Sequence, residues 1–506
     1  MTIDQNHPQH DALLSQLQGN ILKGHGRDHT ANIFLEFHDS QQDAVRAWLG
    51  YFASGMVTTA KMQLAENERF KRHQVPGGLF TGIYLAAAGY EYLGVPDEQW
   101  PIDNANTFAR GMEGAQAKLN DTVEAEWDPT FQNINIHAMV LLAHDDKLAL
   151  SKAVAGLIGE IRRLTLDVPA PPPAPAPFLS SQIRIEYGNA IRNANGDGLE
   201  HFGYVDGISQ PLFFTDEVKK NAKHPVPAGI TGAAPEWDPE ADVTLVLVAD
   251  YAESKNQGSF YVFRKLAQDV RGFKAAEHAL AHDLNMTGDD QELAGALLVG
   301  RFEDGTPVAV SHSDGMIGSG RANNFNYDQD RDGSRCPFQS HVRKTNPRGA
   351  ERMIDSVLLP ASPQMLSHDK GRIMARRGIP YGLREVSTEF DCQPEQFPVG
   401  GAVGLLFQSF QADIGEQFEF IQERWVNDAD FPFPGPPPTG IDALIGQSTG
   451  GAGSNYVWPV NGVAHPRPLA FTQFVTLRGG EYFYAPSVAT LLEIAALPGN
   501  RPAGVP

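Results

Sequence analysis

The order of hydrophobic periodicities over residues 31–164 constrains the fold more than any other feature of the sequence. Residues 31–38 alternate between apolar and polar side chains, which predicts a strand. A helical stripe, two strand-like stretches and a second helical stripe follow in turn, at 41–52, 80–87, 133–143 and 147–164. Strand, helix, strand, strand, helix is the beginning of a ferredoxin-like unit, in which helices cover one face of an antiparallel sheet.

The second half of the chain has the same kind of pattern, without a clear residue-level repeat. Three strand-like stretches and one helical stripe lie at 243–249, 258–266, 404–411 and 413–426. We therefore predict an α+β fold of two ferredoxin-like units, 18–225 and 226–500, with the break between residues 215 and 240.

Three stretches have loop-like composition. The Pro/Ala run 169–178 predicts a stiff connector near the end of the first unit. The Gly/Pro/Asp-rich stretches 303–340 and 428–470 predict long loops, and functional sites are often built on loops held by a rigid scaffold.

Charge and length narrow the class of protein. The 506 residues include 61 acidic and 40 basic side chains, which gives a net charge of −21. Such an acidic surface repels phosphate backbones and anionic lipids, so we expect neither nucleic acid nor a membrane surface as a partner. The two cysteines, Cys336 and Cys392, are too few for a disulfide framework or a zinc cage.

The N-terminal residues 1–19 are polar and lack the charged and apolar regions of a secretory signal. No apolar run approaches the roughly 18 residues that span a bilayer. A cytoplasmic protein is the default expectation, although a leader removed earlier would leave the same sequence.

Three short motifs carry the candidate chemistry. Asp206 lies between Gly203 and Gly207 in 201–211, and Asp beside Gly is by itself most often a turn. His341 lies in 336–348, and a single histidine is usually a surface or core residue. The third motif, 374–382, has two adjacent arginines before a Pro/Gly turn.

In this order, G-Y-V-D-G, C-P-F-Q-S-H-V-R-K-T-N-P-R and R-R-G-I-P-Y-G resemble the dye-decolorizing peroxidase family. The resemblance extends from about residue 18 to residue 413. It implies two ferredoxin-like units that hold haem b. It also implies that H2O2 is used to oxidise dyes, phenols and other aromatic reductants, with Mn²⁺ as a possible further reductant. A homo-oligomer is compatible with it.

The resemblance assigns the central residues of a haem site. His341 matches the proximal iron ligand, and Asp206 matches the distal acid–base residue. Arg376, four positions before Pro380, matches the distal arginine that stabilises O–O heterolysis, with Arg377 as the alternative.

Further matches concern the surroundings of the haem. Arg348 matches an arginine that pairs with a haem propionate. Asp413 matches a carboxylate behind the proximal histidine, but the start of the predicted helix also makes it a candidate N-cap. Leu405 and Phe407 match an apolar wall over the distal face. Tyr381 matches a tyrosine that relays oxidation to the surface, although an ordinary packed turn tyrosine fits equally well.

The residue types suit the chemistry implied. Imidazole is an axial donor that tolerates changes in the oxidation state of iron, and a carboxylate behind it makes it more basic. Glycines beside Asp206 allow the backbone to approach a macrocycle closely. Carboxylates ionise near pH 3.9 and imidazoles near about 6.5, so a carboxylate base predicts turnover that persists in mild acid.

The sequence departs from the family at three positions near the predicted haem. Gly378 stands where some members carry an asparagine, and Tyr204 and Val205 replace the more usual Phe and Arg. We expect altered access or rate.

Two other readings remain open from sequence. A haem carrier or iron-release protein with incidental peroxidase activity would not need the pair Asp206 and Arg376. A haem-free structural module would show no haem absorption.

Two possible metal sites are weaker. A set of acidic residues after the third motif could attract Mn²⁺ or a cationic dye: Glu385, Glu389, Asp391 and Glu395. Residues 328–333 copy the first half of a calcium loop, but Gln339 stands where the bidentate Glu is needed, so a turn is favoured.

Overall fold

The computed structural model describes residues 2–164, 183–221, 237–315, 323–349, 353–354, 357–358, 362–384, 393–398, 402–432, 439–448, 457–460, 463–466 and 473–498. The Pro/Ala run, the predicted unit boundary at 225/226 and the acidic residues Glu385, Glu389 and Asp391 lie outside these residues. The unit boundary therefore stays a prediction.

The first unit has the predicted order of strand, helix, strand, strand and helix, and a fourth strand completes the βαββαβ pattern. Its strands are β1 (His29–Leu35), β2 (Phe80–Leu85), β3 (Ala138–His144) and β4 (Ile183–Asn189). All pairings are antiparallel, and the order across the sheet is β2-β3-β1-β4. Helices α2 (Gln42–Gly55) and α7 (Lys147–Ile161) occupy the two crossovers. This arrangement confirms the ferredoxin-like pattern read from the hydrophobic periodicity.

The second unit repeats the same topology with longer insertions. Its main strands are β8 (Gln257–Gln268), β11 (Ala375–Arg376), β12 (Ile379–Tyr381), β13 (Gly404–Gln411) and β16 (Val475–Ala485). The order is β16-β8-β13, and β11 and β12 both pair with β13. Helices α9 (Val270–Asp283) and α10 (Glu292–Val299) follow β8.

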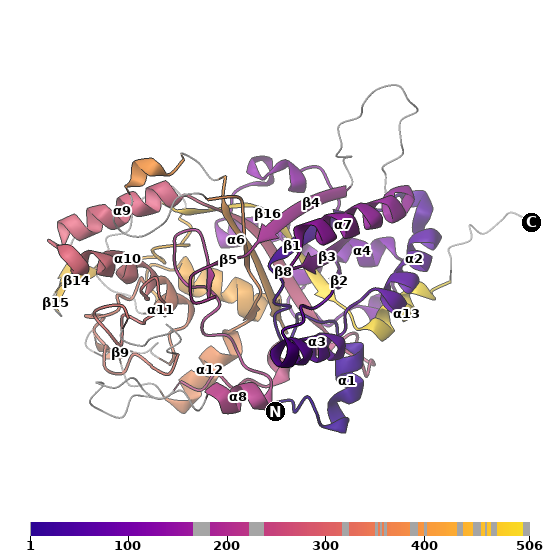
Figure 1. Ribbon diagram of the computed structural model, residues 1–506, viewed down its shortest axis with the longest axis horizontal. Helices are drawn as coiled ribbons and strands as arrows, with labels where there is room; N and C mark the ends of the chain where they lie inside the picture. Colours follow the sequence, from indigo (N-terminus) through magenta and orange to yellow (C-terminus); the bar gives the residue numbers. More distant parts are fainter. Residues whose placement is uncertain are drawn as a thin grey trace, which may run out of the picture.

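The two units share one sheet. A single pairing, Leu85 with Tyr484, joins β2 to β16, so the eight strands from β11 to β4 are continuous. At the far edges the side chain of Ile379 on β12 lies against Gly188 on β4, which brings the ends of the sheet together. In Figure 1 helices α2 and α7 of the first unit lie on one side of these central strands, and helices α9 and α10 of the second unit lie on the other.

The remaining described elements lie around the sheet. They include the helices α1 (Asp11–Gln16), α3 (Ala60–His73), α4 (Ala87–Tyr92), α5 (Thr107–Arg110), α6 (Gln116–Leu119), α8 (Thr215–Asn221), α11 (His341–Thr345), α12 (Pro363–Arg372) and α13 (Val488–Ala495). The short strands form the pairs β5 (Ile191–Arg192) with β6 (Gly198–Leu199), β9 (Met353–Ile354) with β10 (Val357–Leu358), and β14 (Val457–Val460) with β15 (Val463–Pro466). Within the described ranges, no helix combines the length and apolar character needed to cross a bilayer.

Strand β8 is buried on both faces, and its two faces serve different purposes. Tyr261 and Phe263 point to the interface between the units, where the Tyr261 ring stacks on Tyr84 at 4.6 Å and the Phe263 ring meets Phe34 at 5.0 Å. Because successive side chains of a strand alternate, Arg264, Leu266 and Gln268 point to the opposite face. That face lines the candidate site.

Three secondary-structure predictions need correction. Residues 243–249 form a short 3₁₀ helix, Val243–Leu245, and the two-residue strand β7 (Val248–Ala249) rather than one strand, because the Asp242 carboxylate caps a turn there by accepting the Thr244 N–H. Residues 413–426 are helical but form two π-helical segments, Ile414–Glu419 and Ile421–Val426. The predicted loop 428–470 contains the β14–β15 hairpin.

Candidate active site

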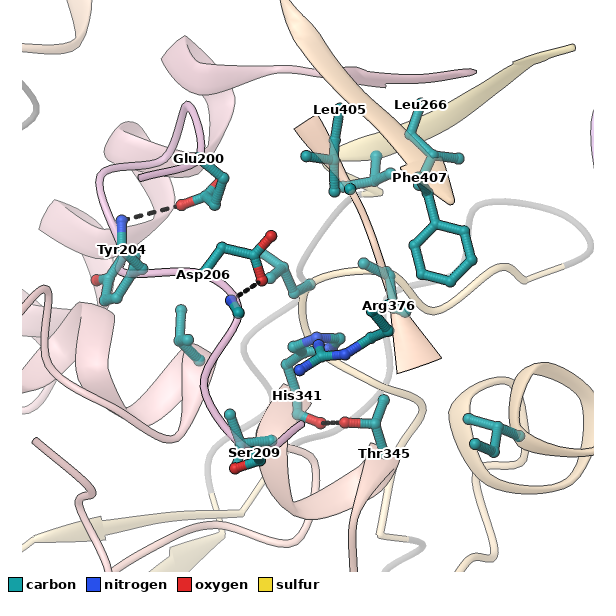
Figure 2. Close-up of a pocket in the computed structure, with 18 of the residues that line it drawn as sticks. Glu200, Tyr204, Asp206, Ser209, Leu266, His341, Thr345, Arg376, Leu405 and Phe407 are labelled. Atoms are coloured by element: carbon teal, nitrogen blue, oxygen red, sulfur yellow. Dashed lines mark hydrogen bonds between the residues drawn. The ribbon is translucent and has the colours of Figure 1, made fainter. Parts of the chain in front are cut away.

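A large cavity lies between the inner face of the second unit's sheet, the loop after β6 and helix α11. About 1790 Å³ of space free of protein atoms lies within it, part of it open to solvent. Asp206, His341, Arg376, Leu405 and Phe407 all line this cavity. Figure 2 shows these side chains around one space, although they come from four separate segments of the chain.

His341 is the first residue of α11, and its ring is held from behind. The Nδ1 atom lies 2.9 Å from Oδ2 of Asp442, whose side chain is fully buried. A carboxylate only accepts hydrogen bonds, so Nδ1 carries the proton and Nε2 keeps its lone pair. That lone pair is available to a metal.

Helix α11 is anchored by a buried ion pair. The Arg343 guanidinium donates to the Asp330 carboxylate at 2.8 Å and to the Asp330 carbonyl at 2.7 Å, between the rings of Tyr327 and Phe338. Asp330 also accepts the N–H groups of residues 335 and 336. The calcium-like sequence 328–333 is therefore a turn that fixes the segment leading to His341.

Asp206 lies on the returning arm of a tight hairpin. Leu199 and Val205 form an antiparallel bridge, and the Asp206 N–H donates to the Gly198 carbonyl at 2.9 Å. Its Oδ1 accepts the Gly207 N–H at 2.6 Å, which leaves Oδ2 for a ligand. Gly207 has φ 81° and lines the cavity.

Gly203 forms the turn of the hairpin and lies away from the cavity lining. Its φ of 114° requires glycine there. Its contribution to the site is therefore to the shape of the loop.

The two adjacent arginines point in different directions. Arg376 lines the cavity, and its Nη2 donates to the Ile208 carbonyl at 2.7 Å. Arg377 instead donates to the carbonyls of Asn20 and Ile21 in the N-terminal segment. Burial lowers the Arg377 pKa to about 10. Of the two arginines, Arg376 is therefore placed to act in the cavity.

One end of the cavity is cationic. Arg301 lines it, and burial lowers the Arg301 pKa to about 10. Ser209 Oγ accepts from Arg301 at 3.1 Å and from Arg348 at 3.2 Å. Two guanidiniums around one hydroxyl make this end attractive to an anionic group.

Arg348 does not line the cavity and lies behind Ser209, which does. Its side chain is fully buried, donates to the carbonyls of Asn323 and Phe325, and has a pKa lowered to about 9 by burial. Direct pairing with a ligand in the cavity, as predicted from sequence, does not match this placement. Arg301, although buried, lines the cavity instead.

The predicted role of Asp413 behind the proximal histidine is wrong. Its Oδ1 accepts the Glu416 N–H at 2.9 Å, so it caps the first π-helical segment, as the local pattern allowed. Asp442 occupies the place behind His341. The other oxygen of Asp413 accepts from the Asn104 side chain at 3.4 Å.

Tyr381 is a buried residue of β12. Only 8% of it is exposed, the Lys265 Nζ lies 4.9 Å from its ring centre, and burial raises its pKa. The relay role stays a prediction. Glu395, the one described member of the acidic set, is exposed on the 3₁₀ turn Pro394–Gln396.

Sequence reasoning missed four residues of the site: Asp442, Arg301, Glu200 and Gln268. Glu200 lies on the Asp206 hairpin, and burial, with a further effect from the Asp206 charge, raises its pKa. The even spacing of Leu266 and Gln268 on β8 was a usable signal, because both share the face that continues to Leu405. Asp442 had none, since it lies 101 residues from its partner.

Known proteins resemble the chain over nearly its whole length. Residues 16–164 match the DyP dimeric alpha+beta barrel domain. The multifunctional dye peroxidase DyP2 of Amycolatopsis sp. is 40% identical over 489 residues, which cover 95% of each protein. The chain belongs to the dye-decolorizing peroxidase family. It is therefore a peroxidase, as the resemblance in sequence implied.

Two further dye-decolorizing peroxidases support this assignment. A peroxidase of Mycena epipterygia is 31% identical over 82% of this chain and 76% of its own length. The crystal structure of the DyP-type peroxidase of Anabaena sp. has a TM-score of 0.82 and 36% identity, with 97% of each chain covered. The α+β fold of two ferredoxin-like units is confirmed.

The cavity of this dye-decolorizing peroxidase suits the haem on which its family depends. His341 offers an Nε2 lone pair on a ring fixed from behind by Asp442. Leu405 and Phe407 line the cavity with apolar surface that suits a flat macrocycle, and Arg301 brings a positive charge that suits its carboxylates.

Proposed function

We propose that this peroxidase binds haem b through His341 and uses H2O2 to oxidise dyes, phenols and other aromatic reductants by one-electron steps. One observation carries the proposal: His341, backed by a buried carboxylate, lines the same cavity as Asp206 and Arg376. A haem carrier needs the histidine with its carboxylate and has no use for an acid–base residue and a guanidinium in the same cavity. The relative named a dye peroxidase supports dyes as reductants.

His341 and Asp442 would set the properties of the bound iron. The Asp442 charge makes the imidazole a stronger donor, which favours the higher oxidation states of the metal. Arg301, with Ser209 beside it and Arg348 behind, would hold the haem carboxylates. When bound, haem supplies the iron that reacts with peroxide and stores its two oxidising equivalents.

Asp206 would move the proton that O–O cleavage requires. Its Oδ2 accepts a proton from one peroxide oxygen and returns it to the other, while Oδ1 stays on the Gly207 N–H. A positioned base of this kind contributes roughly 10²–10⁴ in rate.

Arg376 would stabilise the negative charge on the departing oxygen. Its guanidinium is held by the Ile208 carbonyl, two residues from Asp206, so the cation and the base are fixed on neighbouring backbone. Removing one such donor from an oxyanion site costs about 10²–10³ in rate.

Two variants test the proposal on haem-replete protein. Asp206→Asn is expected to keep its haem and to lose dye turnover with H2O2 by roughly 10²–10⁴. His341→Ala is expected to lose or shift the ferric Soret band. Full turnover in Asp206→Asn would refute the acid–base role, and a purified protein that takes up no haem would refute the proposal as a whole. Mn²⁺ oxidation, self-association and a cytoplasmic location remain predictions from sequence.

A further inference from the structure

The acid loop, residues 198–210, carries Asp206 without belonging to a long helix or strand. Its position relative to the sheet depends on a few tethers. After Asp206, Arg376 on β11 holds the loop through the Ile208 carbonyl at 2.7 Å and the Gln210 side chain at 3.0 Å. Before Asp206, two side chains reach the sheet: the His201 Nε2 atom lies 2.8 Å from the Tyr381 carbonyl on β12, and Glu200 contacts β8.

Glu200 uses its whole carboxylate inside the loop and across to the sheet. Oε2 accepts the Phe202 N–H at 2.8 Å, and Oε1 accepts the Tyr204 N–H at 3.0 Å. Oε2 also accepts from the amide nitrogen of Gln268, near the end of β8. The carboxylate therefore closes the hairpin turn and fastens it to the strand that carries Leu266.

Gln268 makes this contact at a cost. Its side chain is 4% exposed, and its Oε1 is buried with no hydrogen-bond partner. An unsatisfied buried acceptor costs about 1–3 kcal/mol. Proteins commonly retain an unsatisfied buried polar group at sites where a function needs it. Here the amide donates toward Glu200 and leaves its acceptor unused.

We propose that Glu200 is a positioning residue for Asp206, and that its hydrogen bond to Gln268 fixes the distance between the acid loop and the sheet wall of the cavity. The inference rests on the proposed peroxidase mechanism. Figure 2 shows Glu200 and Asp206 on one loop, facing the strands that carry Leu266 and Leu405. The contact of Glu200 with β8, beside that of His201 with β12, and the contact of Ile208 with β11 then lie on either side of Asp206 in the loop.

Three variants separate positioning from charge. Gln268→Met keeps the volume and removes the tether, and a misplacement near 1 Å costs about 10²-fold. We therefore expect the second-order rate constant with H2O2 to fall about tenfold to hundredfold. Glu200→Ala is expected to fall at least as far. Glu200→Gln is expected to stay within a few-fold of the parent, because an amide oxygen in the place of Oε2 still accepts from Gln268 and from the Phe202 N–H, and only the contact with the Tyr204 N–H is lost.

The assay is stopped-flow reaction with H2O2 on folded protein of matched haem content, at constant pH. Gln411→Met is the matched control, since Gln411 is a buried glutamine of β13 outside the cavity lining and should change stability alone. The double variant Glu200→Ala/Gln268→Met should react no more slowly than Glu200→Ala, because both changes remove the same hydrogen bond.

A parental rate in Gln268→Met would overturn the inference, as would a Glu200→Gln variant as slow as Glu200→Ala. Failure of the proposed function looks different: the parent protein itself would then bind no haem or show no reaction with peroxide. The tether would be supported if Gln268→Met reacts slowly with H2O2 while Gln411→Met reacts at the rate of the parent protein.

Discussion

The carboxylate behind His341 offers the sharpest single perturbation, Asp442→Asn. Asp442 Oδ1 accepts the N–H groups of Leu444 and Ile445 at 2.8 and 2.9 Å, and Oδ2 meets His341 Nδ1 at 2.9 Å. An asparagine keeps its oxygen on the two backbone donors, so its NH₂ group faces Nδ1. The neutral imidazole must then carry its proton on Nε2, which removes the lone pair from the cavity.

The expected size follows from what outer partners of metal-bound histidines contribute. Losing such a partner typically costs tenfold to hundredfold in metal affinity, or about 1.4–2.8 kcal/mol. The negative charge of Asp442 stabilises ferric iron more than ferrous iron. If the whole effect falls on the ferric state, the reduction potential rises by about 60–120 mV, at 59 mV per tenfold for one electron.

The measurements are a spectroscopic redox titration of the ferric/ferrous couple and a haem titration of the apoprotein. Asp413→Asn is the matched control: asparagine caps a helix about as well as aspartate, so this variant removes a carboxylate charge and should leave the potential unchanged. An unchanged potential in Asp442→Asn, or a shift of this size in Asp413→Asn, would refute the assignment.

Three further predictions follow from single contacts. Arg376→Leu should slow the reaction with H2O2 by about 10²–10³. Arg377→Leu should lower the free energy of unfolding and leave that rate within a few-fold, because Arg377 donates to N-terminal carbonyls. Equal losses of rate in the two variants, measured by stopped flow, would contradict this prediction. Asp330→Ala leaves the Arg343 charge buried and unpaired, so urea unfolding should show a loss of about 3–5 kcal/mol; a loss under 1 kcal/mol would count against the ion pair as the anchor of α11. Burial lowers the Lys344 pKa to about 7, below the ordinary value of about 10.4. Between these values the unfolded chain binds the extra proton, so this group makes stability rise with pH by up to about 1.4 kcal/mol per unit; Lys344→Met should lack that rise, and parallel stability–pH curves would refute it.

The fold was predictable where a local pattern dictates it. Alternation in 31–38 and 404–411 and helical spacing in 147–161 correctly predict the type of element that forms, although β1 is buried on both faces rather than on its alternating apolar face alone. Residues 243–249 look equally strand-like, but a capped turn after Asp242 interrupts them. A run of alternating Val and Leu carries no information about such a cap.

The joining of the two units into one sheet was beyond the reach of periodicity. One pairing, Leu85 with Tyr484, connects strands almost four hundred residues apart in the sequence. Each strand looks the same whether its neighbour is in its own unit or the other. Strand β8 is buried on both of its faces, and this burial reflects the packing of the two units against each other.

The candidate site was predictable in its ligands and less so in their supports. Asp206, His341 and Arg376 stand in ordered motifs and line one cavity. Their partners Asp442, Gln268 and Arg301 lie in segments without a motif, and each partner is defined by a contact across the fold. Hydrogen bonds between distant segments leave no periodic signal in the sequence.

Asp413 and Asp442 differ in how far their own surroundings satisfy the carboxylate. A carboxylate at the start of a helix accepts hydrogen bonds from the helix itself. Asp413 accepts the Glu416 N–H with one oxygen and the Asn104 side-chain amide with the other. A fully buried carboxylate has the opposite problem, because its charge needs donors on every side. Asp442 meets that need with two backbone N–H groups and the His341 ring. The residue that needs the imidazole, rather than the one already satisfied by its own helix, is the one that can tune it.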